Sequence, residues 1–242
     1  MGTKITPYKN KKENKKAQVA KMFDNIAARY DFLNHFLSLG IDILWRKRAV
    51  REIGKVSPKT ILDIATGTGD LAVEASVLKP TKIIGVDISE GMLDVGRKKM
   101  IANGLDSIIE LQFGDSENLP FDDNSFDAVT AGFGVRNFED LPKGLSEMCR
   151  VMNKGGKIAI LEPAEPTTFP FKQLYNLYFT RFLPFVGKLV SRDNAAYTYL
   201  PESVAAFPRG QAFLKELEIA GFRHPQHIKL TFGIAALYIA TK

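Results

Sequence analysis

A glycine pair and a set of acidic residues form the pattern in this sequence that is best suited to binding a small molecule. The stretch Asp63-Ile-Ala-Thr-Gly67-Thr-Gly69 closes a short apolar run and leads into a helical pattern. Gly67 and Gly69 would let a ligand approach the backbone closely, and the start of the helix offers free N–H donors. Asp87 closes the next apolar run, where a carboxylate can accept hydrogen bonds from both hydroxyls of a ribose. The pattern therefore predicts a site for a nucleoside cofactor.

The glycines alone do not choose the cofactor, because with Ala72 they also satisfy the permissive dinucleotide fingerprint. Asp63 is poorly suited to face a pyrophosphate but well suited to a cofactor that carries an ammonium group. Asp115 and Ser116 follow the third apolar run, where adenine should lie. These features favour S-adenosylmethionine. An NAD-dependent oxidoreductase and a non-catalytic cofactor-binding subunit are the alternatives, and the first would need a hydride-transfer constellation that we do not find.

Short apolar runs alternate with helical patterns, which is typical of a mostly parallel sheet with right-handed crossovers. Strands are expected at 60–65, 82–87, 108–113, 126–130, 157–161, 223–230 and 232–240, and helices at 70–79, 90–103, 139–152 and 209–220. The short connection between the last two strands predicts that they are antiparallel. We therefore expect an α/β, Rossmann-like Class I methyltransferase fold, with a mostly parallel seven-stranded sheet and an antiparallel last strand.

Residues 17–242 are expected to form a single domain, with an N-terminal helical cap over 17–53 and an aromatic-rich helical insertion on the substrate side over 169–205. Residues 1–16 hold six lysines and one glutamate, so they carry +5 of the net charge of +6. We expect them to be a basic flexible tail whose deletion leaves activity on a water-soluble substrate unchanged. The nearly neutral body argues against a nucleic-acid partner, and anionic lipid is the partner that suits the tail.

The composition excludes several classes of protein. The chain is 45% hydrophobic and 25% charged, as in ordinary globular domains. Its single cysteine, Cys149, cannot form an intrachain disulfide, and the three histidines show no metal-ligand spacing, so no metal site is expected. No apolar run approaches the roughly 18 residues of a membrane span or resembles a signal peptide. A cytoplasmic protein is expected, and the sequence does not predict its oligomeric state.

Two long motifs and one pentapeptide stand outside the cofactor pattern. They are Tyr30-Asp31-x-x-Asn34-x-x-x-Ser38-x-Gly40-x-x-x-x-Trp45-Arg46, Arg150-Val151-Met152-Asn153-Lys154-Gly155-Gly156 and Phe133-Gly134-Val135-Arg136-Asn137. Together they resemble the ubiquinone/menaquinone biosynthesis C-methyltransferase family, and the resemblance covers residues 17–242. Lys154 stands where the family usually has proline and Asn153 replaces a common lysine, which predicts a looser turn rather than lost function.

The resemblance implies transfer of a methyl group from S-adenosylmethionine to a ring carbon of a prenylated quinol. By the same resemblance, the cofactor contacts fall on Thr68, Asp87, Asp115 and Ser116. Demethylmenaquinol is the favoured substrate because it is the more widespread assignment among relatives with this pattern. A benzoquinol precursor of ubiquinone and another small molecule are the alternatives.

Arg136 and Asn137 are the candidate catalytic residues, because they follow the fourth expected strand at the edge where ligands bind in such sheets. A quinone ring is not nucleophilic, so the reduced quinol must react, through the carbon ortho to a phenolate oxygen. We expect Arg136 to favour the phenolate or to position a water that takes the proton, and Asn137 to orient the hydroxyl. Alternatively, Arg136 pairs with Glu139 or Asp140.

Tyr30, Asn34 and Tyr199 are the candidate substrate contacts, whereas His35 is expected to be structural. The insertion could form the groove for a prenyl tail, with Arg181 and Lys188 near lipid headgroups in a peripheral membrane contact, or its aromatic side chains could form a core-facing stripe. These aromatic residues are Phe169, Phe171, Tyr175, Tyr178, Phe179, Phe182 and Phe185.

Overall fold

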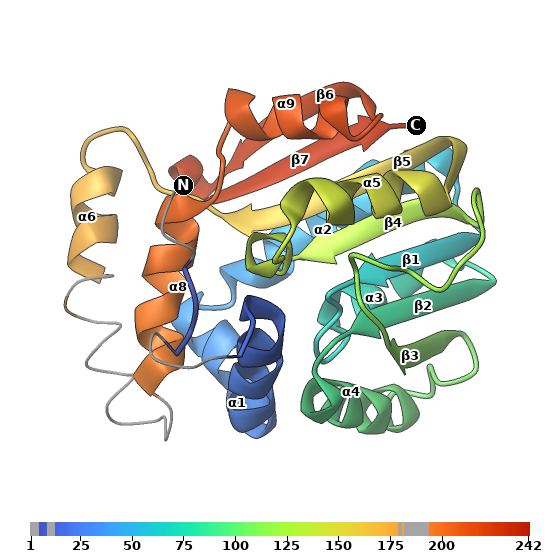
Figure 1. The fold of residues 1–242 in the computed structure, drawn as a ribbon, viewed down its shortest axis with the longest axis horizontal. Coiled ribbons are helices and arrows are strands. Elements are labelled where there is room, and N and C mark those ends of the chain that lie inside the picture. The colour runs from blue at the N-terminus through green and yellow to red at the C-terminus, as the bar shows by residue number, and fades with distance from the viewer. Residues whose placement is uncertain (1–4, 9–12, 179–180, 182–193) are drawn as a thin grey trace.

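The computed structural model describes residues 5–8, 13–178, 181 and 194–242, and it is built around a seven-stranded sheet (Figure 1). The strand order is β3-β2-β1-β4-β5-β7-β6. The strands are β1 Thr60–Ile64, β2 Lys82–Asp87, β3 Ile109–Phe113, β4 Phe126–Gly132, β5 Met152–Pro163, β6 Arg223–Leu230 and β7 Ala235–Thr241. β1 to β5 pair in parallel, whereas β7 is antiparallel to both neighbours, β5 and β6. The expected fold class is confirmed.

Helices cover both faces of the sheet. α2 (Ile41–Ile53), α3 (Asp70–Ala75) and α4 (Glu90–Ala102) share one buried cluster with the sheet, and α5 (Leu141–Val151) and α9 (Gln211–Ile219) share the other. Both clusters draw on the same strands, because successive side chains of a strand point to opposite faces. This explains why the strands read as continuous apolar runs.

A helical cap lies beyond the carboxyl ends of the parallel strands. It contains α1 (Lys15–Leu37), α6 (Phe171–Leu177) and α8 (Asn194–Ala206), on the left in Figure 1. The expected cap over 17–53 also included α2, but the end of α2 packs on the sheet. The chain moves outward from β1 to β3 and then crosses to β4 on the other side of β1, so β1 and β4 flank the point where ligands bind in such sheets. The cap faces that point. Among the described residues, no helix has the length and apolar composition needed to cross a bilayer.

Several element boundaries differ from the expected ones, among them the end of α3 at Ala75 rather than 79 and the end of β4 at Gly132 rather than 130. α1 begins at Lys15, so the last two residues assigned to a flexible tail belong to a helix. β5 begins at Met152 and is longer than expected, with an irregular register opposite β4. The last strand begins at Ala235 rather than 232, because Thr231 and Phe232 adopt left-handed backbone conformations in a short 3-10 turn.

Candidate active site

The turn between β1 and α3 is shaped by the two glycines that the sequence singled out. Gly67 and Gly69 have φ values of 56° and 82°, in the region that favours glycine. A Cβ at Gly69 would lie 2.9 Å from the end of the Met100 side chain, so this turn also packs tightly against α4. The N–H of Gly67 donates to Asp87 Oδ2 at 2.8 Å, which joins the ends of β1 and β2.

Asp87 lies at the carboxyl end of β2 and lines a cavity there. Its Oδ1 accepts a hydrogen bond from the N–H of Ser89 at 2.8 Å, and only 8% of the residue is exposed. Burial raises the pKa of its carboxyl to about 6, against the lowering effect of the backbone donors. Each carboxylate oxygen can accept more than one hydrogen bond, so acceptor capacity remains for a ribose diol.

Asp63 takes a supporting position that the sequence did not predict. It lies beneath the glycine turn, where its oxygens accept hydrogen bonds from the hydroxyls of Thr66 and Thr130, both at 2.6 Å. Burial raises its pKa to about 6. Asp63 is not among the residues that line the cavity beside Asp87, so a contact with the ammonium group of a cofactor stays a prediction.

Thr68 also points away from the cavity lining. Its hydroxyl donates to Asp31 in α1 and accepts from Lys99 in α4 at 3.1 Å. Lys99 also reaches Asp70 at 2.6 Å, so this partly buried cluster joins the glycine turn to the cap. The structure thus gives Thr68 a tertiary role, and its contact with the cofactor likewise stays a prediction.

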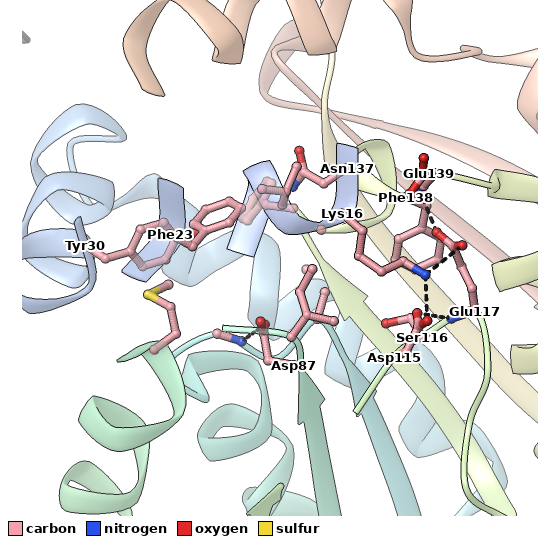
Figure 2. Close-up of a pocket in the computed structure, with 18 residues that line it drawn as sticks. Lys16, Phe23, Tyr30, Asp87, Asp115, Ser116, Glu117, Asn137, Phe138 and Glu139 are labelled. Atoms are coloured by element: carbon pink, nitrogen blue, oxygen red, sulfur yellow. Dashed lines mark hydrogen bonds and ion pairs between the residues drawn. The ribbon is translucent and has the colours of Figure 1, made fainter. Parts of the chain in front are cut away.

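Asp115 and Ser116 follow β3 and line the same cavity as Asp87 (Figure 2). Lys16 reaches across from α1, with its Nζ 2.6 Å from Asp115 and 3.0 Å from Glu117. Lys15 donates to the backbone oxygen of Phe138 at 2.7 Å and to that of Arg136 at 3.2 Å. The expectation that residues 1–16 form a flexible tail is therefore wrong for these two lysines, which hold α1 against the loops of the site. It is also wrong for Ile5 and Tyr8, which pack against α1.

Two cavities meet beneath the cap. The smaller, of about 50 Å³, lies between α1 and the strand ends, and the larger, of about 460 Å³, lies among α1, α2, α6 and α8. The larger falls within the roughly 300–1,000 Å³ that is typical of small-molecule sites. Both cavities are lined by Phe23, Tyr30, Phe133 and Asn137. The sites therefore share a wall, at which a group could pass from one ligand to another.

Arg136 and Asn137 lie in a 3-10 turn directly after β4, and both line the larger cavity. Arg136 Nη1 donates to Glu162 Oε2 at 3.0 Å and also to the backbone oxygen of Phe133. The alternative pairing with Glu139 or Asp140 is wrong, because the guanidinium pairs with Glu162 instead. The actual partner, Glu162 at the carboxyl end of β5, was not predicted from the sequence.

Glu162 could have been found from the sequence. It stands directly after the expected strand 157–161, just as Asp87 ends its own apolar run. The side chain is fully buried, and burial raises the pKa of its carboxyl although the Arg136 guanidinium lowers it.

Tyr30, Asn34 and Tyr199 all line the larger cavity, as a substrate site requires. Tyr30 shares a side-chain hydrogen bond with Asn34. Three buried polar atoms of the lining have no hydrogen-bond partner within the described part of the chain. They are Arg136 Nε, Asn137 Oδ1 and Tyr199 OH. A buried polar atom without a partner costs free energy, so each is a candidate for bonding to a ligand.

The aromatic insertion contributes to the larger cavity through Phe171, Tyr175 and Tyr178. Phe171 stacks on Phe232 with ring centroids 3.9 Å apart, whereas Phe169 is 81% exposed. Both interpretations of the insertion thus find support, since its aromatic side chains line a groove and also pack on the body. The remaining insertion residues for which roles were expected lie outside the described residues, apart from the exposed Arg181. They are Phe179, Phe182, Phe185 and Lys188.

His35 has a structural setting. Its Nδ1 lies 2.9 Å from Asp42, and its Nε2 lies 3.6 Å from Asp70. Arg46 contacts the same two aspartates at 2.5 and 3.0 Å. The motif that begins at Tyr30 therefore combines cavity-lining side chains with an ion-pair cluster that fastens the cap.

The sheet order, the glycine turn and the acidic strand ends define a Class I methyltransferase that uses S-adenosylmethionine. A solved S-adenosylmethionine-dependent methyltransferase from Thermotoga maritima, described as a possible histamine N-methyltransferase, has the same fold. It superposes with a TM-score of 0.62 at 21% identity, over 92% of this chain and 99% of the other.

Residues 9–242 match the ubiE/COQ5 methyltransferase family, and the chain belongs to that family. It is 51% identical over 241 residues to a demethylmenaquinone methyltransferase of Bacteroides fragilis, covering 99% of this chain and 98% of the relative. It is 44% identical to a ubiquinone/menaquinone biosynthesis C-methyltransferase of Geotalea daltonii, covering 93% and 96%. The family match begins at residue 9, so part of the segment that we expected to lie outside the resemblance belongs to it.

Proposed function

We propose that this chain transfers a methyl group from S-adenosylmethionine to a ring carbon of a prenylated quinol, and that the quinol is demethylmenaquinol. The observation that carries the proposal is the shared wall between a polar cavity at the strand ends and a larger apolar cavity under the cap. Relatives from Bacteroides fragilis and Porphyromonas gingivalis are named demethylmenaquinone methyltransferases, at 51% and 44% identity. The Geotalea relative's name includes ubiquinone, so a benzoquinol is the second candidate substrate.

The residues of the smaller cavity suit the cofactor. Asp87 offers acceptors for the ribose, Asp115 and Ser116 offer polar groups for the adenine edge, and Gly67 leaves space beside the backbone. When bound there, S-adenosylmethionine supplies an electrophilic methyl group. Lys16 of α1 lies across this cavity, so its contacts with Asp115 and Glu117 would break and re-form as the cofactor enters.

The charge balance of the larger cavity suits a neutral apolar substrate. Arg136 is compensated by Glu162, and Arg46 is compensated by Asp42 at 2.5 Å. Most of the other lining residues are apolar or aromatic. Among its described lining residues, an anionic substrate would find no uncompensated cation, whereas a prenyl chain would replace water with apolar contacts.

We assign the reaction's proton handling to the polar atoms without partners. The free edge of Arg136 would stabilise the phenolate form of the hydroxyl beside the reacting carbon, and Asn137 Oδ1 would accept a hydrogen bond that orients the ring. Tyr199 OH would hold the second hydroxyl. Burial raises the pKa of Tyr199 to about 12, so this hydroxyl stays protonated and can donate. Methylation replaces one ring hydrogen, so one proton leaves per turnover.

We also propose that the mouth of the larger cavity rests on a lipid surface, because a prenylated substrate dissolves in membranes. Leu39 and Leu174 line this cavity and are 83% and 59% exposed. Phe232 is 67% exposed beside Phe171. Exposed apolar side chains mark protein or membrane contacts and ligand grooves, and a membrane-dissolved substrate favours the membrane here. Flotation with liposomes tests this, and protein that remains wholly unbound would contradict it.

The proposed activity is tested with purified protein, labelled S-adenosylmethionine and a short-chain demethylmenaquinol under reducing conditions. A benzoquinol analogue runs in parallel, and the oxidised quinones serve as matched controls. Label is expected in methylated naphthoquinol and in neither oxidised control. Label in neither quinol product would contradict the proposal, and label in the benzoquinol alone would replace the substrate.

A further inference from the structure

Glu162 is a fully buried carboxylate next to the proposed reaction site. It occupies the carboxyl end of β5, between the buried Leu161 and Pro163, and pairs across the sheet with Ala236 of β7. A carboxylate in such surroundings is costly unless it is paired and hydrogen-bonded. Its partners therefore indicate what it does.

All the partners that fix Glu162 belong to the turn after β4. Oε2 accepts from Arg136 Nη1 at 3.0 Å, and Oε1 accepts from the backbone N–H of Arg136 at 3.3 Å. The same Nη1 also donates to the backbone oxygen of Phe133. The Nη1 edge of the guanidinium is thus held by two acceptors, Glu162 and the backbone oxygen of Phe133. The backbone N–H of Arg136 is also held by Glu162.

The other edge of the guanidinium is left for the cavity. Arg136 Nε is buried and has no partner in the described structure, although Arg136 lines the larger cavity. Burial is the main cause that raises the pKa of the Tyr199 hydroxyl. The nearby charge of Arg136 lowers this pKa, and that of Glu162 raises it. The pair therefore acts electrostatically on the cavity in which the quinol would bind.

We propose that Glu162 is a positioning residue that anchors the Nη1 edge of Arg136 and so presents the Nε edge to the hydroxyl of the substrate. The inference rests on the proposed quinol methylation. An unanchored guanidinium has several rotamers, and only some of them would stabilise the phenolate at the moment of methyl transfer. Glu162 also keeps the cavity close to neutral before the substrate loses its proton.

The test is a double-mutant cycle on kcat, measured with saturating S-adenosylmethionine and quinol. Glu162→Gln keeps the shape of the side chain and removes its charge, and we expect kcat to fall about 10- to 100-fold with an unchanged Kd for S-adenosylmethionine. In an Arg136→Gln background the same substitution should cost nothing further, because Glu162 acts through Arg136. Additive losses, or an unchanged kcat in the single variant, would overturn the proposal.

Glu52→Gln is the matched control. Glu52 is also a buried carboxylate, 2% exposed, and it pairs with Arg48, Lys55 and Lys157 near the other end of β5. Its loss should lower the melting temperature and leave kcat unchanged. If the unmodified chain methylates no quinol, the proposed function fails; if it does and Glu162→Gln matches it, only the positioning role fails.

A readout without turnover completes the test. The ¹⁵N resonance of Arg136 Nε is expected to be sharp in the unmodified chain and broadened in Glu162→Gln, because the side chain becomes mobile. Should the glutamine variant not fold, Glu162→Asp keeps the charge but withdraws the oxygens by one methylene. An aspartate variant with full kcat and a sharp Nε resonance would overturn the proposal.

Discussion

The two cavities differ in how the chain builds them. The smaller is formed mostly by successive strand ends, with Gly67 after β1, Asp87 at the end of β2 and Asp115 after β3. The larger is assembled from α1, α2, the turn after β4, the insertion and the turn before β7. The first is fixed by the rigid edge of a sheet, and the second depends on helices that pack over that edge. Substitutions should therefore separate cofactor binding from substrate handling.

The largest effect is expected at Asp87. Asp87→Asn keeps the size of the side chain but turns one acceptor oxygen into a donor that faces the N–H of Gly67 or Ser89. Hydrogen bonds to charged groups contribute about 1.5–3 kcal/mol, so the Kd for S-adenosylmethionine should rise about 100-fold in calorimetry. The KM for the quinol should change little once the cofactor is saturating. An unchanged Kd would remove Asp87 from the cofactor site.

The same carboxyl predicts a pH dependence. Burial raises the pKa of Asp87 from 3.8 to about 6, so the folded chain binds the proton more tightly than the unfolded chain. The free energy of unfolding should thus fall as the pH rises between these values. The ionised carboxylate is the better acceptor, so affinity for S-adenosylmethionine should weaken up to about tenfold per unit as the pH falls below about 6. Asp87→Asn should abolish the pH dependence of the affinity for S-adenosylmethionine. If this dependence persists, Asp63 is the group that titrates.

On the substrate side, Tyr199→Phe is expected to lower kcat/KM for the quinol about tenfold, because one hydrogen bond to a hydroxyl is lost. The Kd for S-adenosylmethionine should not change. The hydroxyl that is removed is buried and has no partner in the described structure, so the variant should melt at a higher temperature. Calorimetry with steady-state kinetics checks both parts, and a lower melting temperature with full activity would contradict both.

Lys15 and Lys16 test whether cofactor binding requires α1 to be held against the loops of the site. Deleting residues 2–4 should leave kinetics unchanged, whereas Lys15→Met with Lys16→Met should raise the Kd for S-adenosylmethionine about fivefold. The reason is that Lys16 bridges Asp115 and Glu117 while partly exposed, so its contribution is modest. This replaces the expectation that all of residues 2–16 are dispensable. Equal kinetics for both variants would restore it.

The smallest effect is expected at the cavity mouth. Leu174→Ser replaces an exposed apolar side chain of the lining, so the KM for a long-chain quinol should rise about threefold. A short-chain quinol should be unaffected. Leu177→Ser, on the same helix but outside the cavity lining, is the matched control. An equal rise in the KM for both quinols would contradict a contact between Leu174 and the prenyl tail.

Much of the fold was predictable because its signals are local. Continuous apolar runs predicted strands, since both faces of the sheet are covered, and the extents of β2 and β6 were matched. Gly67 and Gly69 marked a turn that needs positive φ values. The start of β7 was mispredicted because the apolar Phe232 was taken as part of the strand, whereas it adopts a left-handed turn conformation.

The candidate site was predictable where a residue's position on its strand is enough. Asp87 and Ser116 line the smaller cavity because parallel strands deliver their carboxyl ends to one edge. Thr68 is different, since its rotamer points to Asp31 and Lys99, residues of two other helices. No local pattern encodes that choice.

The sequence by itself determined the class of fold and the strand ends that form the cofactor site, because periodicity and turn chemistry act over a few residues. The family was indicated separately, by the resemblance of its long motifs. Only the tertiary structure decided that Arg136 pairs with Glu162, that Lys16 spans to Asp115 and that the two cavities share Asn137. These contacts join segments 26 and 99 residues apart. These contacts form only when the helices pack over the edge of the sheet. That packing depends on the burial of apolar side chains along the whole chain.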